Sequence, residues 1–113
     1  MRRFLESVLL LRLHLGSAHG YSLLDGLEEF GLGGLDPSMI YRVLRGMEEL
    51  GWVTSTWDEQ QSQGPPRRIY RISADGNDVL AKWAADLEQS KSRIERFLNT
   101  YHQHLEECEG EHD

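Results

Sequence analysis

The sequence predicts a mainly α-helical fold that carries one small β-hairpin and ends in a long helix. A helix with clear start and stop signals begins near Asp36 and ends near Gly51. Two short strand-like runs then flank a tip rich in glycine and proline, and the segment 74–107 repeats apolar residues every three or four positions. A chain of 113 residues suits one hydrophobic core. We therefore expect one domain over 1–73, a helix over 74–107 and an acidic, disordered tail over 108–113.

Apolar residues upstream of Asp36 predict two more helices. Apolar side chains lie nearly all round the segment 4–15, which is more apolar than a helix with one solvated side should be. A partner is expected to cover this surplus. Residues 19–21 then interrupt the pattern, and four apolar residues mark a second helix: Leu23, Leu24, Leu27 and Phe30.

The third helix has a marked start, a marked end and two different faces. The Asp36 carboxylate can accept amide hydrogens of the first turn, Pro37 suits the first helical position, and Gly51 can close the C-terminus. At about 100° per residue one face is apolar and the opposite face is polar, aromatic and cationic. The apolar face contains Ile40, Val43, Leu44, Met47 and Leu50, and the opposite face contains Ser38, Tyr41, Arg42 and Arg45.

A hairpin is predicted directly after this helix. Residues 53–57 and 69–72 are strand-like, and QQSQGPPRR between them is a turn-rich tip that contains Arg67 and Arg68. A basic hairpin after a helix with a basic face is the arrangement of a winged helix-turn-helix. In that fold the helix suits a DNA major groove, and the hairpin suits the flanking backbone or the minor groove.

The net charge of −7 at first argues against DNA binding, because phosphate contacts supply most non-specific affinity. The distribution of charge removes this objection. Residues 1–72 hold eight Lys and Arg against nine Asp and Glu, whereas residues 73–113 hold four against ten. The expected reading surface presents its arginines without an interleaved acid, so an acidic protein can still offer a basic face.

The long helix carries a heptad of residues that predicts a helix–helix seam: Leu80, Trp83, Leu87, Ser90, Ile94, Phe97 and Tyr101. We expect a homodimer in which the first helix packs alongside this seam. A monomer with the long helix folded back is the alternative. The expected interface comprises Phe4, Leu5, Val8, Leu9, Leu80, Trp83, Leu87, Ile94, Phe97 and Tyr101.

Three stretches, LLLRLHLGSAHGYSLLDGLEE, LDPSMIYRVLRGMEELGWV and GPPRRIYRISADG, resemble the PadR family of bacterial transcriptional regulators. The resemblance covers residues from about 5 to 97. It implies a dimeric repressor of operator DNA that is released by a small molecule. The lack of a convincing signal peptide or membrane span separately predicts a cytoplasmic protein. Ser38, Met39 and Arg42 depart from residues that are common in the family, so the operator cannot be transferred from relatives.

The resemblance and the helical positions together nominate DNA contacts. Ser38 and Tyr41 are expected to hold phosphates, and Arg42 and Arg45 to read bases. The two arginines of the hairpin are expected to serve phosphates or a narrow minor groove, with plain solvation as the alternative. A structural role in the turn is the alternative for Tyr21. The nominated contacts are Tyr21, Ser38, Met39, Tyr41, Arg42, Arg45, Arg67 and Arg68.

Two further sites are weighed. The family resemblance implies an aromatic-lined pocket between subunits for flat aromatic effectors. Its candidate lining residues are Phe4, Val8, Trp83 and Leu87, and the alternative for Trp83 is a role in the dimer core.

His104, Cys108 and His112 recur every four residues, so a continuous helix would align them as ligands for a metal or haem. The alternative to a metal site is that the helix–helix seam ends here and that the acidic end of the helix frays.

Other classes of protein are disfavoured. No phosphate-binding loop, His-Glu-x-x-His motif or activated nucleophile is present, so we expect neither an enzyme nor a cofactor. Glu6 and Arg12 interrupt the apolar run 4–15, which argues against a signal peptide or membrane span, and a single cysteine agrees with a reducing compartment. The remaining alternatives are a winged-helix adaptor that binds another protein, and a repressor that senses metal or haem.

Overall fold

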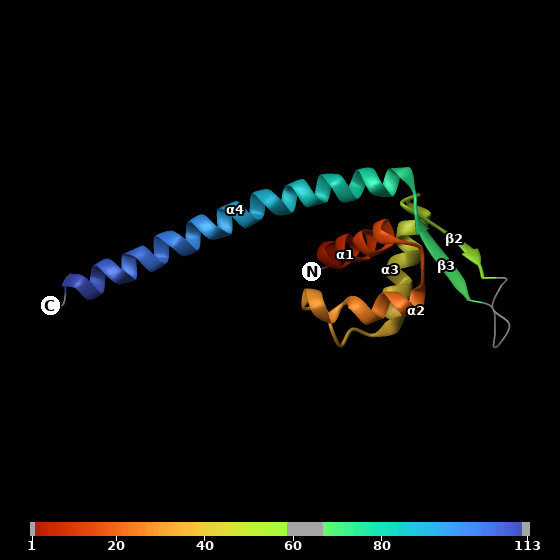
Figure 1. Ribbon diagram of the computed structural model, residues 1–113, viewed down its shortest axis with the longest axis horizontal. Coiled ribbons are helices and arrows are strands. Elements are labelled where there is room, and N and C mark those ends of the chain that lie inside the picture. The colour runs from red at the N-terminus through yellow and green to blue at the C-terminus, as the bar shows by residue number, and fades with distance from the viewer. Residues whose placement is uncertain (1, 59–66, 112–113) are drawn as a thin grey trace. The chain divides into compact units, whose positions relative to one another are not determined.

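The structure is a computed structural model that describes residues 2–58 and 67–111. The chain divides into two compact units, residues 1–81 and residues 82–113. In chain order the elements are α1 (Arg2–Leu15), β1 (Ala18–His19), α2 (Gly20–Leu23), two short 3₁₀ turns η1 (Leu24–Gly26) and η2 (Glu28–Phe30), α3 (Pro37–Glu49), β2 (Val53–Trp57), β3 (Arg68–Ile72) and α4 (Ala74–Glu111). Figure 1 labels α1 to α4, β2 and β3.

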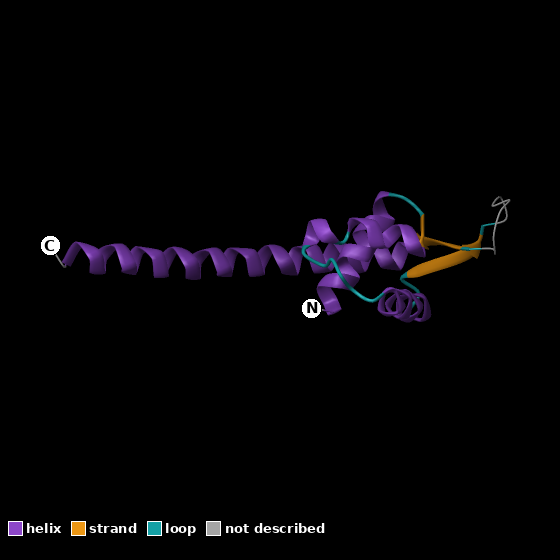
Figure 2. Ribbon diagram, turned by 90° about the horizontal axis from the view of Figure 1, so that it is seen from below, coloured by secondary structure: helices purple, strands orange, loops and turns teal. Residues whose placement is uncertain are grey.

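The predicted fold class is confirmed: the protein is mainly helical with a small antiparallel sheet, drawn in orange in Figure 2. The strand order is β1-β3-β2, and β2 pairs with β3 from Val53↔Ile72 to Trp57↔Arg68. β2 has the predicted bounds and β3 begins one residue earlier than predicted. The sequence did not predict β1, which pairs Ala18 with Tyr70 and His19 with Ile69.

The core of the first unit is built mostly from leucines. Leu5, Val8 and Leu9 of α1, which were predicted at a dimer interface, are at most 3% exposed in the single chain. α1 contacts β3, and most of its apolar side chains are buried in the single chain, although Leu15 at its end is 77% exposed. The largest fully buried side chains are Leu5, Leu9, Leu10, Leu23, Leu27, Ile40, Leu44, Met47 and Val53.

α3 begins and ends where its local signals predict. Asp36 Oδ1 accepts a hydrogen bond from the Ser38 backbone N–H at 3.0 Å, and Gly51 follows the helix with a φ of 82°, which favours glycine. Leu50 is 61% exposed, so its assignment to the apolar face was wrong. Leu50 is the C-cap residue, beyond the last helical residue, so the helical periodicity does not determine the direction of its side chain.

The second helix was predicted as longer than it is. α2 has four residues, and the following segment tightens into η1 and η2. Leu23 and Leu27 are nevertheless buried, as their apolar pattern indicates. At Gly26, an added Cβ would lie against the Arg12 guanidinium, which would have to move to make room for it.

α4 is longer than predicted and begins in the first unit, which extends to Ala81 rather than ending at residue 73. Ser73 caps α4, because its Oγ accepts a hydrogen bond from the Gly76 N–H at 3.0 Å. The helix continues to Glu111, so residues 108–111 are helical instead of disordered.

Candidate nucleic-acid interface

The solvent side of α3 carries aromatic and cationic side chains. Tyr41, Arg42 and Arg45 are exposed, while the opposite side of the helix is buried in the core. At the start of the helix, the hydrogen bond from the Ser38 backbone lowers the pKa of Asp36 below its usual range. Its negative charge is therefore kept at the positive end of the helix dipole.

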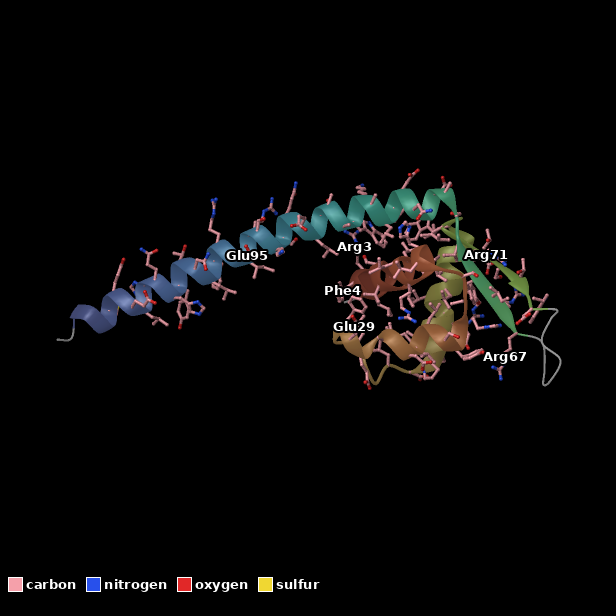
Figure 3. All side chains as sticks on the ribbon, viewed as in Figure 1. Arg3, Phe4, Glu29, Arg67, Arg71 and Glu95 are labelled. Carbon is pink, nitrogen blue, oxygen red and sulfur yellow. The ribbon has the colours of Figure 1, made fainter. Side chains whose placement is uncertain are left out.

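One face of the hairpin is directed toward the same side as Tyr41. Alternation along the strands puts Ser55 and Trp57 of β2 on one face with their cross-strand partners Tyr70 and Arg68 of β3. Tyr70 is buried, whereas Trp57 is 55% exposed. The other face of the hairpin carries Arg71, whose Nη1 donates a hydrogen bond to Thr56 Oγ1 at 3.1 Å. Figure 3 labels Arg71 and also Arg67, which lines the groove described below.

A groove of about 880 Å³ separates α3 and the start of α2 from the hairpin. Its lining combines aromatic rings with cationic groups, and it draws on four elements, α2, α3, β2 and β3. The lining residues are Gly20, Tyr21, Tyr41, Arg45, Glu48, Trp57, Arg67, Arg68 and Tyr70.

Both arginines of the hairpin lie over aromatic rings. The Arg67 Cζ is 4.5 Å from the ring centroid of Tyr21, and the Arg68 Cζ is 4.5 Å from that of Trp57. Tyr21 is in turn stacked on His19, with ring centroids 5.1 Å apart. Such cation–π contacts hold a guanidinium plane while its N–H edge stays free to donate elsewhere.

The tip end of the two hairpin strands is tied to β1, the strand that precedes α2. His19 Nε2 and Asp58 Oδ2 are 2.8 Å apart, and the Asp58 backbone N–H donates to the Arg67 carbonyl at 2.8 Å. These contacts join Asp58 and Arg67, the described ends of the two hairpin segments, to each other and join Asp58 to β1.

An acid also lies in the groove. Glu48 Oε2 is 2.7 Å from Ser55 Oγ, and Arg68 Nη1 is 2.8 Å from the same Ser55 oxygen. Burial, followed by the nearby Glu48 charge, raises the pKa of Tyr70 above its usual value. The sequence-based expectation of a reading surface without an interleaved acid was therefore wrong.

Gly20 permits a close approach between α2 and α3. A Cβ at this position would overlap the ring of Tyr41 at Cε1. The glycine is therefore required for Tyr41 to take its place at the groove.

The groove brings together five of the eight residues predicted to contact DNA: Tyr21, Tyr41, Arg45, Arg67 and Arg68. Ser38 and Arg42 are exposed and Met39 is half-buried on the first turns of α3, outside the groove lining. Sequence reasoning missed Glu48 and Trp57. The strand alternation that places Trp57 beside Ser55 could have indicated the tryptophan.

The other predicted sites are less defined. In the first unit Val8 is buried in the core and Phe4 is half-buried; in the second, Trp83 is half-buried and Leu87 is 44% exposed. The effector pocket remains a prediction.

The predicted metal site is only partly within the described residues. His104 Nε2 and Cys108 Sγ are 3.5 Å apart, and His112 lies outside the described residues. Within residues 2–58 and 67–111 no group of three or more His, Cys, Asp or Glu is arranged to hold a metal ion.

No helix in the described part of the chain has the length and apolar character needed to cross a membrane.

The chain is similar to known regulators in sequence. Residues 9–82 match the family described as the transcriptional regulator PadR-like family. Over 47 residues the chain is 43% identical to a probable transcriptional regulator of Mycobacterium tuberculosis. That match covers 42% of this chain and 24% of the relative, so it spans about a quarter of the relative's length.

Solved structures have the same fold. A conserved protein of unknown function, described as a potential transcriptional factor, is 37% identical with a TM-score of 0.80, and 91% of each chain is covered. Bacillus subtilis PadR in complex with operator DNA is 24% identical with a TM-score of 0.63, covering 72% of this chain and 46% of that one. Because the family match covers more than half of the sequence, the chain belongs to the PadR-like family of transcriptional regulators.

Proposed function

We propose that this protein is a transcriptional regulator that binds duplex DNA through α3 and the β2–β3 hairpin. The observation that carries the proposal is the groove in which Arg45 of α3, Arg67 and Arg68 converge with exposed aromatic rings. Arginine forks pair bidentately with guanine edges and with phosphates, and aromatic rings pack on sugars and bases. A helix and a hairpin that share one cationic face match the docking of winged helices.

The relatives support this choice of ligand. Bacillus subtilis PadR, whose structure was solved in complex with operator DNA, has the same fold as this chain. In the present chain Arg42 and Arg45 are the candidates for base contacts, with Ser38, Met39 and Tyr41 beside them. Tyr21, Arg67 and Arg68 are proposed to contact the backbone or minor groove.

The proposed assembly is a homodimer formed through α4. From Leu87 onward an apolar stripe of this helix is exposed in the single chain, with Ile94 58% and Phe97 68% exposed. A self-complementary helix seam would cover it. Two copies would place two α3 helices in successive major grooves about one helical turn apart, roughly 34 Å.

Repression and release by an effector are the finer parts of the proposal. A dimer on a promoter would block transcription, and a flat aromatic molecule near Trp83 would release DNA only if it bound free protein more tightly than operator-bound protein. Fluorescence quenching measured on a variant that keeps Trp83 alone among the three tryptophans, with and without operator, tests this. Equal affinity in both states would reject effector release.

The DNA proposal is tested by gel-shift titration over a salt series, using a duplex that the full chain selects from random sequence. Arg42→Ala and Arg45→Ala should each weaken binding by about 1–3 kcal/mol while leaving the dimer intact. Arg71→Ala is the matched control, since it removes the same charge from the opposite hairpin face. A steep loss of affinity with salt is expected. Binding that is absent, or equally weakened by all three substitutions, would contradict the proposed reading face.

A further inference from the structure

Glu48 is an acid on the face proposed for DNA, where a carboxylate repels phosphates. It is half-buried and lines the groove together with Arg45 and Arg68. It also lies in the last turn of α3, where a negative charge is unfavourable to the helix dipole. Neither attraction of DNA nor stability of the helix accounts for an acid at this position.

The contacts of Glu48 fix the direction of a hydrogen-bond relay. A carboxylate only accepts and a guanidinium only donates, so the hydroxyl between them must do both. Ser55 Oγ therefore donates to Glu48 Oε2 at 2.7 Å and accepts from Arg68 Nη1 at 2.8 Å. The relay connects α3, β2 and β3, and hydrogen bonds in such a chain strengthen one another.

Arg68 is held on two sides by this arrangement. Ser55 binds one end of the guanidinium, and the Trp57 ring lies against its face at 4.5 Å. An arginine fixed in this way loses less conformational freedom when it forms a bidentate contact with DNA. The Glu48 charge also offsets part of the arginine's attraction for any phosphate, whatever the sequence.

We propose that Glu48 is a positioning residue that orients Arg68 through Ser55 and so raises the preference of the protein for its operator over other DNA. The inference rests on the proposed function. It makes a prediction opposite to simple electrostatics: loss of a negative charge from a DNA-binding face should strengthen all binding, whereas loss of Glu48 should weaken binding to the operator.

The experiment measures dissociation constants of the full chain for its selected duplex and for an unrelated duplex at several salt concentrations. Glu48→Ala and Ser55→Ala should each lower the ratio of operator to non-specific affinity about five- to tenfold. The double variant should lose no more than either single variant, because both break one relay. Glu48→Gln keeps an acceptor oxygen and should retain most of the ratio.

Glu49→Ala is the matched control, because Glu49 is the exposed neighbour of Glu48 and does not line the groove. It should strengthen both kinds of binding slightly without lowering the ratio. Thermal unfolding followed by circular dichroism checks that each variant is folded, and Ser55→Ala tests the relay without any change of charge.

The inference is overturned if Ser55→Ala leaves the ratio unchanged, if Glu48→Ala behaves as Glu49→Ala does, or if Glu48→Gln loses as much as Glu48→Ala. A wild-type chain that selects no duplex and binds none in a salt-dependent manner contradicts the proposed function itself. Failure of the inference and failure of the function therefore give different results.

Discussion

α3 and α4 are both amphipathic helices, but their apolar faces have different surroundings. Ile40 and Leu44 of α3 are 0% exposed, whereas Ile94 and Phe97 of α4 are 58% and 68% exposed in the single chain. The periodicity that identified each apolar face was equally clear in the sequence. The difference teaches that periodicity indicates which side of a helix is apolar, and that only the tertiary structure shows whether the chain itself covers it.

The covered face of α3 should give the largest loss of stability. Leu44→Ala removes a fully buried side chain and leaves a cavity among well-packed neighbours, so the free energy of unfolding should fall by about 2–5 kcal/mol. Urea unfolding at a fixed protein concentration measures the change. Leu50→Ala, at the exposed end of the same helix, is the control and should cost less than about 0.5 kcal/mol. Equal losses would mean that the two leucines do not differ in burial.

The uncovered face of α4 should instead control self-association. Phe97→Asp places a charge on the apolar stripe and should weaken a dimer roughly 30-fold or more, measured by sedimentation velocity across protein concentration. Asn99→Asp introduces the same side chain about 200° further round the helix and should have little effect. A dimer that tolerates Phe97→Asp as well as Asn99→Asp would exclude the stripe as the interface.

The fold was predictable where short-range signals act alone. The Asp36 cap, Pro37 and Gly51 bound α3 because each acts on neighbouring backbone groups. The sequence did not show that Leu5 and Leu9 of α1 are buried in the single chain, because α1 packs partly against β3, more than fifty residues later in the chain. β1 was missed because a two-residue strand has no periodicity to detect.

The candidate site was predictable only in part, for the same reason. Arg45 was identified from the helical positions of α3, and Arg68 from the basic tip of the hairpin. Glu48 was not, because its contact depends on how β2 packs against α3, which brings Ser55 within 2.7 Å. Trp57 was not identified either, because its contact with the Arg68 guanidinium depends on the strand register that pairs the two residues.

The caps of the two helices give the smallest expected effect and the most specific one. Asp36 caps α3 with a charged carboxylate, whereas Ser73 caps α4 with a neutral hydroxyl. The hydrogen bond from the Ser38 backbone lowers the pKa of Asp36 in the folded protein. Its stabilisation is therefore present above the ordinary pKa of 3.8 and is lost as the pH falls through the lower, folded-state pKa.

Thermal unfolding of the wild type, Asp36→Ala and Asp36→Ser between neutral pH and acid measures this difference. The wild type should unfold at a higher temperature than Asp36→Ala at pH 7, and the gap should shrink only below the ordinary pKa of the carboxyl group. Asp36→Ser gives α3 the kind of cap that α4 has, so its smaller advantage over Asp36→Ala should not change with pH. A gap between wild type and Asp36→Ala that stays constant into acid would show that the Asp36 charge contributes nothing to the cap, and that both helices are capped by a neutral hydrogen bond alone.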